Sequence, residues 1–428
     1  MGYNFGLTKE VSASVKNKLN RFLASLGPAV SKGEDITFAD NDLTYILKLQ
    51  NKRFKDKGLD VEYEYYSRED DVDHVGVASD WRDSHYSSVV CTKQCGIRRT
   101  FSKDGQKLYK DNRKSFTYAT VTDVVTDSHP DNDSYCCPNC GAVSTIAQLQ
   151  SGCSFCGTKY KIDDLFPKVT SYYSLDDVGI NSKEGKRGMM FSMIGAMVFT
   201  LLLTIIIQCF KSGKSDGSDI VETVLSLILL LPISALGGYF FYSIFLLVRL
   251  IVVGSRQSSG KWGTIGSRQK FEARMRKIYP EFSFEYFTSK ATSLIKTAVF
   301  TDNEQDLLFY KGAPLSPELK DIIDLNYGGA LGVNSVEEIN GMTYVRTNAF
   351  FDVLYYRDDK IFLRRQVFNA SFARRTDIPI DYNFSMTKIQ CPSCGSSFDA
   401  IRNKNCPFCG HTYEIESNDW TLTEFTLK

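Results

Sequence analysis

Eight of the chain's twelve cysteines fall into four C-x-x-C pairs, and the pairs form two separate groups. Two residues between two thiolates let one tight turn aim both sulfurs at one ion, and two such turns complete a tetrahedral site. The spacing therefore predicts two structural Zn²⁺ ions, each held by four thiolates. The expected ligands are Cys137, Cys140, Cys153 and Cys156 in the first group, and Cys391, Cys394, Cys406 and Cys409 in the second.

A glycine follows every pair, and glycine readily takes the left-handed backbone that closes such a turn. Four thiolates leave no open coordination position, which disfavours a catalytic zinc. Three alternatives remain for these cysteines: a redox pair, disulfides, or iron in the same cage. A redox protein needs only one C-x-x-C near a βαβ pattern, and a chain with a large core needs no disulfide staples.

The remaining cysteines carry weaker signals. Cys136 adjoins the first group, and the C-P-x-C-G register that it shares with the second group assigns Cys137, rather than Cys136, as the ligand. Cys91 and Cys95 lie on strand-like sequence and are expected to be buried. Cys209 ends an apolar run, where an apolar filler is expected.

No catalytic site emerges from the other reactive residues. The chain has four histidines, and none can be combined with a nucleophile and an acid by spacing; they are His74, His85, His129 and His411. The acidic run 68–74 fits a solvated loop better than a cation site. Phosphate-binding loops, nucleophile elbows and H-E-x-x-H helices are all missing from the sequence. We therefore expect a protein that is not an enzyme.

Two long apolar runs, 189–210 and 223–249, predict a transmembrane hairpin over 188–253. A helix of about 20 apolar residues crosses a bilayer core, and a soluble core helix, the alternative, rarely stays uncharged for so long. The connection between the runs, the nine residues 211–219, is short enough for a tight hairpin. The N-terminus has no apolar h-region, so no secretory signal peptide is expected.

A cluster of basic residues follows the second run and sets the expected orientation, because Lys and Arg favour the cytoplasmic side. Both termini are therefore predicted to be cytoplasmic, at the plasma membrane, where free thiolates also survive best. The same side chains could attract anionic lipid. They are Arg256, Lys261, Arg268, Lys270, Arg274, Arg276 and Lys277.

The flanks read as α+β. Helices are expected at 11–26, ended by Gly27-Pro28, and at 40–57, 282–300 and 316–327. Strands are expected at 61–66, 86–92, 96–102, 114–125, 341–356 and 360–375. The predicted organisation is an amphipathic helix in 1–35, a first α+β module 36–175 with its zinc ribbon at 137–156, the hairpin, a basic linker 254–279, and a second module 280–428 with its ribbon at 391–409.

The two modules share one outline, which predicts an internal duplication around a membrane hairpin. Each has helices, strands joined by a short Asp-containing turn, two C-x-x-C turns (here called knuckles) and a final strand. The expected fold class is α+β, with two modules. Each module combines a curved antiparallel sheet with helices and ends in a four-cysteine zinc ribbon. The stripe of apolar residues in 11–26 could lie on a membrane, or more often packs on its own domain.

The second flank resembles bacterial membrane proteins of the Tim-forty-four-like type that carry a zinc ribbon. The resemblance covers roughly 280–428 and, more faintly, 40–173. It implies a cone-shaped domain similar to nuclear transport factor two, in which a curved sheet and helices form a pocket, although the first copy has a less clear helix pair. The residues that carry it are Phe282-Ser283, Cys391-Pro392-Ser393-Cys394-Gly395, Cys406-Pro407-Phe408-Cys409-Gly410 and Asp419-Trp420-Thr421-Leu422.

Closed metal sites and missing catalytic motifs favour a membrane-anchored binding or scaffold protein that recruits a protein partner or contacts lipid. Nucleic-acid binding through the ribbons is an alternative, but the formal net charge is only +1 and basic residues do not cluster there. An enzyme that uses the pocket of the cone is another alternative. A pore would require the hairpin to form homo-oligomers.

Overall fold

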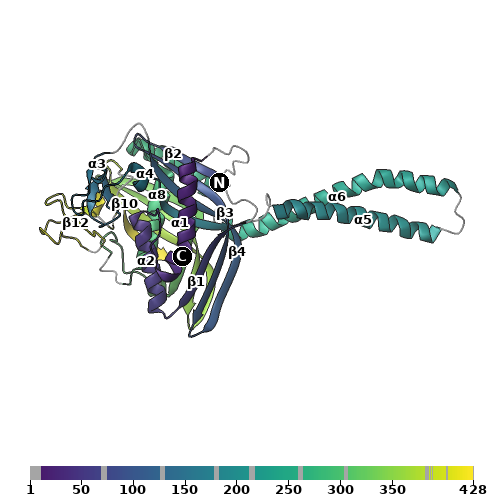
Figure 1. Ribbon diagram of the computed structural model, residues 1–428, viewed down its shortest axis with the longest axis horizontal. Coiled ribbons are helices and arrows are strands. Elements are labelled where there is room, and N and C mark those ends of the chain that lie inside the picture. Colours follow the sequence, from purple (N-terminus) through teal and green to yellow (C-terminus); the bar gives the residue numbers. More distant parts are fainter. Residues whose placement is uncertain are drawn as a thin grey trace. The chain divides into compact units, whose positions relative to one another are not determined.

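The computed structural model describes residues 11–427 except 69–74, 126–130, 178–182, 212–216, 259–263, 303–306, 381–384, 386, 388 and 402 (Figure 1). The chain divides into two compact units. Asp176–Ser259 is one unit, and the other combines Met1–Leu175 with Gly260–Lys428. Both flanks of the predicted hairpin therefore belong to one compact unit. The larger unit mixes helices with antiparallel sheets, as the α+β class requires.

Helices α1 (Ala13–Lys32) and α2 (Asn41–Asp56) open the larger unit. The apolar stripe of α1 lies buried in the unit's own core, in contact with α2 and the first sheet. Of the two alternatives for this helix, packing on its own domain is therefore the one observed. α2 begins where expected, because the Asp40 carboxylate accepts a hydrogen bond from the Leu43 N–H at 2.7 Å.

The predicted end of the first helix at Gly27-Pro28 is wrong, since α1 continues to Lys32 and ends at Gly33. A Cβ atom on Gly27 would lie 2.3 Å from the Tyr63 carbonyl oxygen. The glycine thus lets the helix pack closely on the neighbouring strand. Burial of Ala29 and Val30 in the following turn favours the helix beyond the proline, although proline removes one backbone hydrogen bond.

The first sheet contains β1 (Asp60–Ser67), β2 (Gly76–Arg82), β3 (Tyr86–Lys103), β4 (Gln106–Val124) and β7 (Lys168–Asp176). Its order is β1-β3-β4-β7, with β2 also paired to β3. The β3–β4 hairpin turns at Asp104-Gly105, where both residues have positive φ. Such a two-residue turn suits the right-handed twist of the strands that it joins.

The second sheet contains β8 (Ile322–Ile339), β9 (Met342–Arg357), β10 (Lys360–Arg375) and β13 (Thr421–Leu427), in the order β8-β9-β10-β13. The two sheets therefore share one strand order. In each, the strand that follows the cysteine group lies on one side of a long hairpin; on the other side, β8 alone pairs with β9 in the second sheet, whereas β1 and β2 both pair with β3 in the first.

The helix predicted at 316–327 is wrong. Only a single 3₁₀ turn, η2 (Pro317–Asp321), follows the Ser316-Pro317 start signal, and β8 begins at Ile322. Ile322 and Ile323 are β-branched and fully buried, and Ile322 pairs with Tyr355 of β9. The strand propensity of these residues and their burial outweigh the helix start signal.

Helices α7 (Thr264–Ile278) and α8 (Phe284–Phe300) complete the larger unit's long helices. α8 begins within two residues of the expected start at 282, and its N-cap is Ser283, whose side chain accepts from the Tyr286 N–H at 3.2 Å. The stretch predicted as a basic linker, 254–279, holds α7. Phe271 and Met275 of that helix are buried in the core that α8 and the second sheet share.

Polar side chains join the two flanks within the larger unit. The Arg53 guanidinium of α2 donates to the carbonyl oxygens of Val299 at 3.0 Å and Leu319 at 3.0 Å. The Asn326 amide on β8 exchanges two hydrogen bonds with the backbone of Ser174 on β7, at 2.9 and 2.8 Å. The two flanks are therefore joined by hydrogen bonds inside a common core.

The smaller unit consists of α5 (Lys183–Lys211) and α6 (Gly217–Ser258). Arg187–Ile207 and Val224–Val248 are long and apolar enough to cross a membrane, with mean hydropathy 2.5 and 2.1. A Cβ on Gly238 would lie 2.6 Å from the Ser192 carbonyl oxygen, and the Ser192 hydroxyl donates to the Gly238 carbonyl at 3.0 Å. Small residues thus let the two helices approach closely, as in membrane helix pairs.

Candidate metal centres

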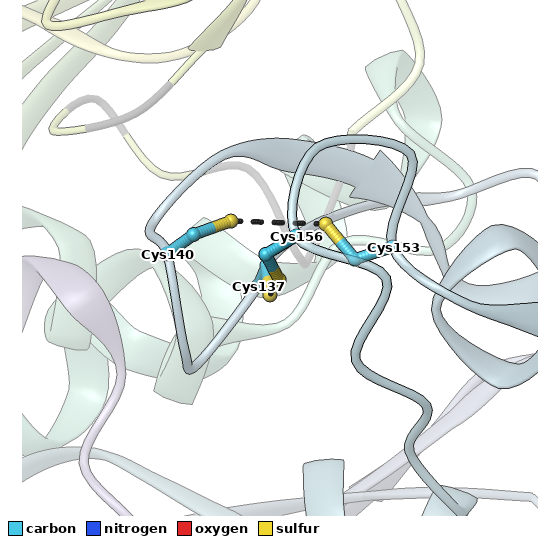
Figure 2. Close-up of side chains that lie close together, drawn as sticks. All are labelled: Cys137, Cys140, Cys153 and Cys156. Atoms are coloured by element: carbon cyan, nitrogen blue, oxygen red, sulfur yellow. Dashed lines mark hydrogen bonds between the residues drawn. The ribbon is translucent and has the colours of Figure 1, made fainter.

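The first cysteine group lies on two turns, one that joins β5 (Ser134–Cys136) to β6 (Val143–Thr145) and one that follows α3 (Ile146–Ser151), and Figure 2 shows its four side chains close together. Cys137 follows β5, and the chain returns through β6 and α3 to the second turn. The Sγ atoms of Cys137 and Cys156 lie 3.7 Å apart, as do those of Cys140 and Cys153. All four ligand atoms lie within 4.8 Å of one another.

The second group repeats this geometry around β11 (Ile389–Gln390) and β12 (Ser397–Phe398). The Sγ atoms of Cys391 and Cys409 lie 3.6 Å apart, and so do those of Cys394 and Cys406. This group also keeps its four ligand atoms within 4.8 Å. The structure therefore brings together every cysteine that the spacing predicted, in the predicted sets of four.

These sulfur separations fit a tetrahedral metal cage. Zn–S bonds of about 2.3 Å place the sulfurs of a regular tetrahedron about 3.8 Å apart. A disulfide would need about 2.05 Å, and the eight cysteines are free. Both groups could therefore hold a metal ion, and the donor chemistry is that of structural zinc.

All four turns have the same backbone. The glycine that ends each turn has positive φ, at 72° for Gly141, Gly157 and Gly395 and 75° for Gly410. Its N–H donates to the carbonyl of the first cysteine in the pair, at 2.8 to 2.9 Å. The N–H of that cysteine donates to the carbonyl of the residue after the glycine. Backbone hydrogen bonds alone therefore hold each knuckle in its turn conformation.

Hydrogen bonds from neighbouring groups shift the thiol pKa values in opposite directions within each group: those of Cys153, Cys156 and Cys394 are lowered, and those of Cys140 and Cys409 are raised. The Thr158 hydroxyl and N–H lower the pKa of Cys156 to about 6, and the hydroxyl lies 3.3 Å from Sγ. The hydroxyl and N–H of Ser396 lower the pKa of Cys394 to about 6 in the same way. Because metals bind thiolates, a lowered pKa reduces competition from protons at neutral pH.

Three of the four cysteines outside the groups lie where the sequence suggested, and the side chain of Cys209 lies outside the described residues. Cys136 is buried, and its thiol donates to the Gly141 carbonyl at 3.4 Å without joining the first group. Cys91 and Cys95 are buried in β3, and burial raises the pKa of Cys91 to about 12. Such thiols are poor nucleophiles.

The predicted lipid-binding residues are spread over several environments. Lys270, Arg274, Arg276 and Lys277 are exposed on α7. Arg268 is half-buried and pairs with Glu272 and Glu285. The side chain of Arg256 and all of Lys261 lie outside the described residues. Among the described residues, the exposed part of the basic cluster therefore comprises four side chains on α7.

Two histidines, His85 and His411, are exposed, while His74, His129 and most of the acidic run 68–74 lie outside the described residues. His411 contributes its backbone carbonyl, which accepts from the Cys406 N–H at 2.8 Å.

Sequence patterns did not reveal that the two metal groups are neighbours. The Val143 N–H donates to the Ser397 hydroxyl at 2.6 Å, which links β6 to the start of β12. A cleft of about 1170 Å³ lies between the groups, and its lining includes Tyr135 and Pro138 from one and Pro392 from the other. These contacts join residues far apart in sequence, so no local signal could have indicated them.

The cleft also contains an acid with a shifted pKa. Burial and the neighbouring Asp42 raise the pKa of Asp40 to about 7, and Lys168 and Lys290 partly oppose the shift. Asp40 lines the cleft at the start of α2.

Comparisons with models of known protein families, with curated proteins and with solved structures found no match. The resemblance to Tim-forty-four-like proteins therefore stays a prediction that rests on the sequence alone.

Proposed function

We propose that this protein is a membrane-anchored, zinc-stabilised binding or scaffold protein at the cytoplasmic face of the plasma membrane. It recruits a protein partner or contacts lipid there. The observation that carries the proposal is the pair of closed four-thiolate groups, side by side, in a chain with two helices apolar enough to span a bilayer. Closed thiolate cages favour a structural role for the ions.

The first test is the metal itself. Full-length protein purified under reducing conditions should contain two zinc ions per chain by elemental analysis. Chelation should lower the thermal stability of the larger unit, because binding and folding of such sites are coupled. A metal content near zero, or iron in place of zinc, would remove the zinc part of the proposal.

The orientation has its own test. An epitope inserted in 212–216 should be accessible from outside intact cells, whereas one added after Lys428 should be accessible only after permeabilisation. This follows from the excess of Lys and Arg beside the second apolar run. The opposite pattern would reverse the proposed orientation and leave the metal sites unaffected.

Lipid contact is proposed for the exposed basic face of α7. A basic side chain near anionic lipid contributes roughly 1 kcal/mol. Full-length protein in nanodiscs should show stronger amide-exchange protection of α7 in anionic than in neutral lipid. A variant with Lys270, Arg274, Arg276 and Lys277 changed to Gln should lose that difference. The whole chain is required, since the flank 254–428 alone would expose the buried faces that it packs against α2.

The finer architecture is part of the proposal. We infer that the two flanks arose by duplication and that each sheet is curved, as in the cone that the Tim-forty-four resemblance implies. The shared strand order of the two sheets supports the duplication. An experimental structure whose two sheets superpose poorly, knuckles included, would contradict it.

A further inference from the structure

Side chains bridge the two knuckles of the first metal group. Asn139 lies between the two cysteines of one knuckle, and Thr158 follows the glycine that ends the other. The Asn139 amide donates to the Thr158 hydroxyl oxygen at 3.0 Å. That oxygen lies 3.3 Å from Sγ of the ligand Cys156. The three side chains thus form one chain of hydrogen bonds, from an amide on one knuckle to a ligand sulfur on the other.

The direction of these hydrogen bonds follows from the chemistry of the ligand. A thiolate has no proton, so its sulfur only accepts hydrogen bonds. Because Asn139 donates to the oxygen of Thr158, the hydroxyl's own proton is left to be donated to the Cys156 sulfur. Asn139 therefore orients the hydroxyl, and the hydroxyl holds the sulfur. A hydrogen bond to an ionised acceptor is roughly twice as strong as a neutral one, so this contact resists movement of the ligand.

The second group has other residues at these two positions. Ser393 stands where the first group has Asn139, and His411 stands where it has Thr158. The backbone turns are common to both groups, whereas this side-chain bridge depends on residues that the first group alone contains. The cysteines of the first group also pack in a small cluster of their own, while those of the second belong to the largest core. The bridge therefore supports the group that has less packing behind it.

We propose that Asn139 and Thr158 are positioning residues for the first metal site. The backbone turn aims the Cys156 sulfur, and the bridge retains it there, so that the ion leaves this site more slowly. Hydrogen-bond partners of metal ligands commonly change metal affinity by about 10- to 100-fold. This inference rests on the proposed structural zinc sites and adds the residues that control how firmly one of them keeps its ion.

The test follows metal release from each group separately. Full-length protein in nanodiscs of neutral phosphatidylcholine is loaded with zinc and mixed with excess chelator, and N-ethylmaleimide labels the cysteines as the ion leaves. Mass spectrometry distinguishes peptides of the first group from peptides of the second. Thr158→Val keeps the shape of the side chain and removes its hydroxyl. This variant should speed labelling of the first group about tenfold or more and leave labelling of the second unchanged.

Three further variants separate the hydroxyl from the shape of the side chain. Thr158→Ser keeps the hydroxyl and should release metal nearly as slowly as wild type. Asn139→Ala should speed release from the first group less than Thr158→Val does. Combined with Thr158→Val, it should give less than the product of the two single effects, because the residues act in one chain. Ser393→Ala is the matched control: it changes the corresponding position of the second group and should leave both groups at the wild-type rate.

Cobalt gives a spectroscopic check. In protein loaded with Co²⁺, Thr158→Val should shift the thiolate-to-cobalt charge-transfer band, and Thr158→Ser should restore it. An unchanged band overturns the inference, as does release from the first group of Thr158→Val that is as slow as in wild type. So does release from Thr158→Ser that is as fast as from Thr158→Val, or an equal effect on both groups. Wild-type protein that holds no zinc would instead contradict the proposed function.

Discussion

The two metal groups have the same knuckles but different surroundings. Cys391 and Cys406 belong to the largest hydrophobic core, together with Phe398 and Trp420. Cys137 and Cys153 belong to a small separate cluster with Ile146, Leu149 and Phe166. The backbone turn alone determines ligand geometry, since all four knuckles share it. The residues packed against each knuckle determine how much of the structure would unfold if its metal ion were lost.

The largest expected effect separates the two groups. Cys406→Ser and Cys153→Ser should each remove one ion, because structural zinc binding contributes about 10–16 kcal/mol to folding of its site. Cys406→Ser should also lower the melting temperature of the larger unit markedly, since its knuckle shares a core with Trp420. Cys153→Ser should leave that temperature nearly unchanged. Equal shifts in calorimetry would show that the two groups are equally coupled to the core.

The next effect tests how the flanks are joined. Lys290 on α8 lies 3.1 Å from Asp42 on α2 and 2.8 Å from Asp419, which precedes β13. All three side chains are buried. Lys290→Met leaves two buried carboxylates without their cation and should cost about 3–5 kcal/mol in chemical denaturation. A cost below about 1 kcal/mol would mean that the packing, and not this ion cluster, holds the flanks together.

A smaller effect contrasts the N-caps of α2 and α8. α2 begins at Asp40, an acid with a raised pKa, and α8 begins at Ser283, which does not titrate. Ser283→Ala should cost about 0.5–2 kcal/mol at any pH. For Asp40 the sign is opposite to that of most acids: a raised folded pKa gives stability below pH 4 that is lost as pH rises to about 7.

Asp40→Asn keeps a good cap and removes the titration. The free energy of unfolding of this variant, minus that of wild type, should therefore increase between about pH 4 and pH 7 and stay level above that. Comparing the variants at equal pH cancels the pH dependence of metal binding. A difference that stays flat with pH would show that Asp40 has an ordinary pKa.

The smallest effect is expected for an exposed contact between the same flanks. Lys103 at the end of β3 donates to Asp359 in the β9–β10 turn at 2.8 Å. Because water screens this pair, Lys103→Gln should leave the free energy of unfolding unchanged within error. A clear loss would show that the flanks are joined at their surface as well as in their interior.

Local features of this fold could be predicted from sequence. The knuckles, the Asp104-Gly105 turn and the caps at Asp40 and Ser283 each depend on a few consecutive residues. The shared interior could not, because contacts such as Gln50 with Asp324 join residues 274 positions apart. The strand at Ile322 was missed for a related reason, since its pairing partner in β9 decides its conformation.

The order of elements along the chain has a consequence for biosynthesis. The first sheet is translated before α5 and α6, and its buried Arg99 pairs with Asp324, which emerges from the ribosome 225 residues later. The first sheet must therefore wait, with apolar surface uncovered, while the two apolar helices are synthesised. Because the flanks Met1–Leu175 and Gly260–Lys428 form one compact unit, they must lie on the same side of any bilayer that α5 and α6 cross. If only one of these helices crossed, the flanks would lie on opposite sides and neither could complete its core.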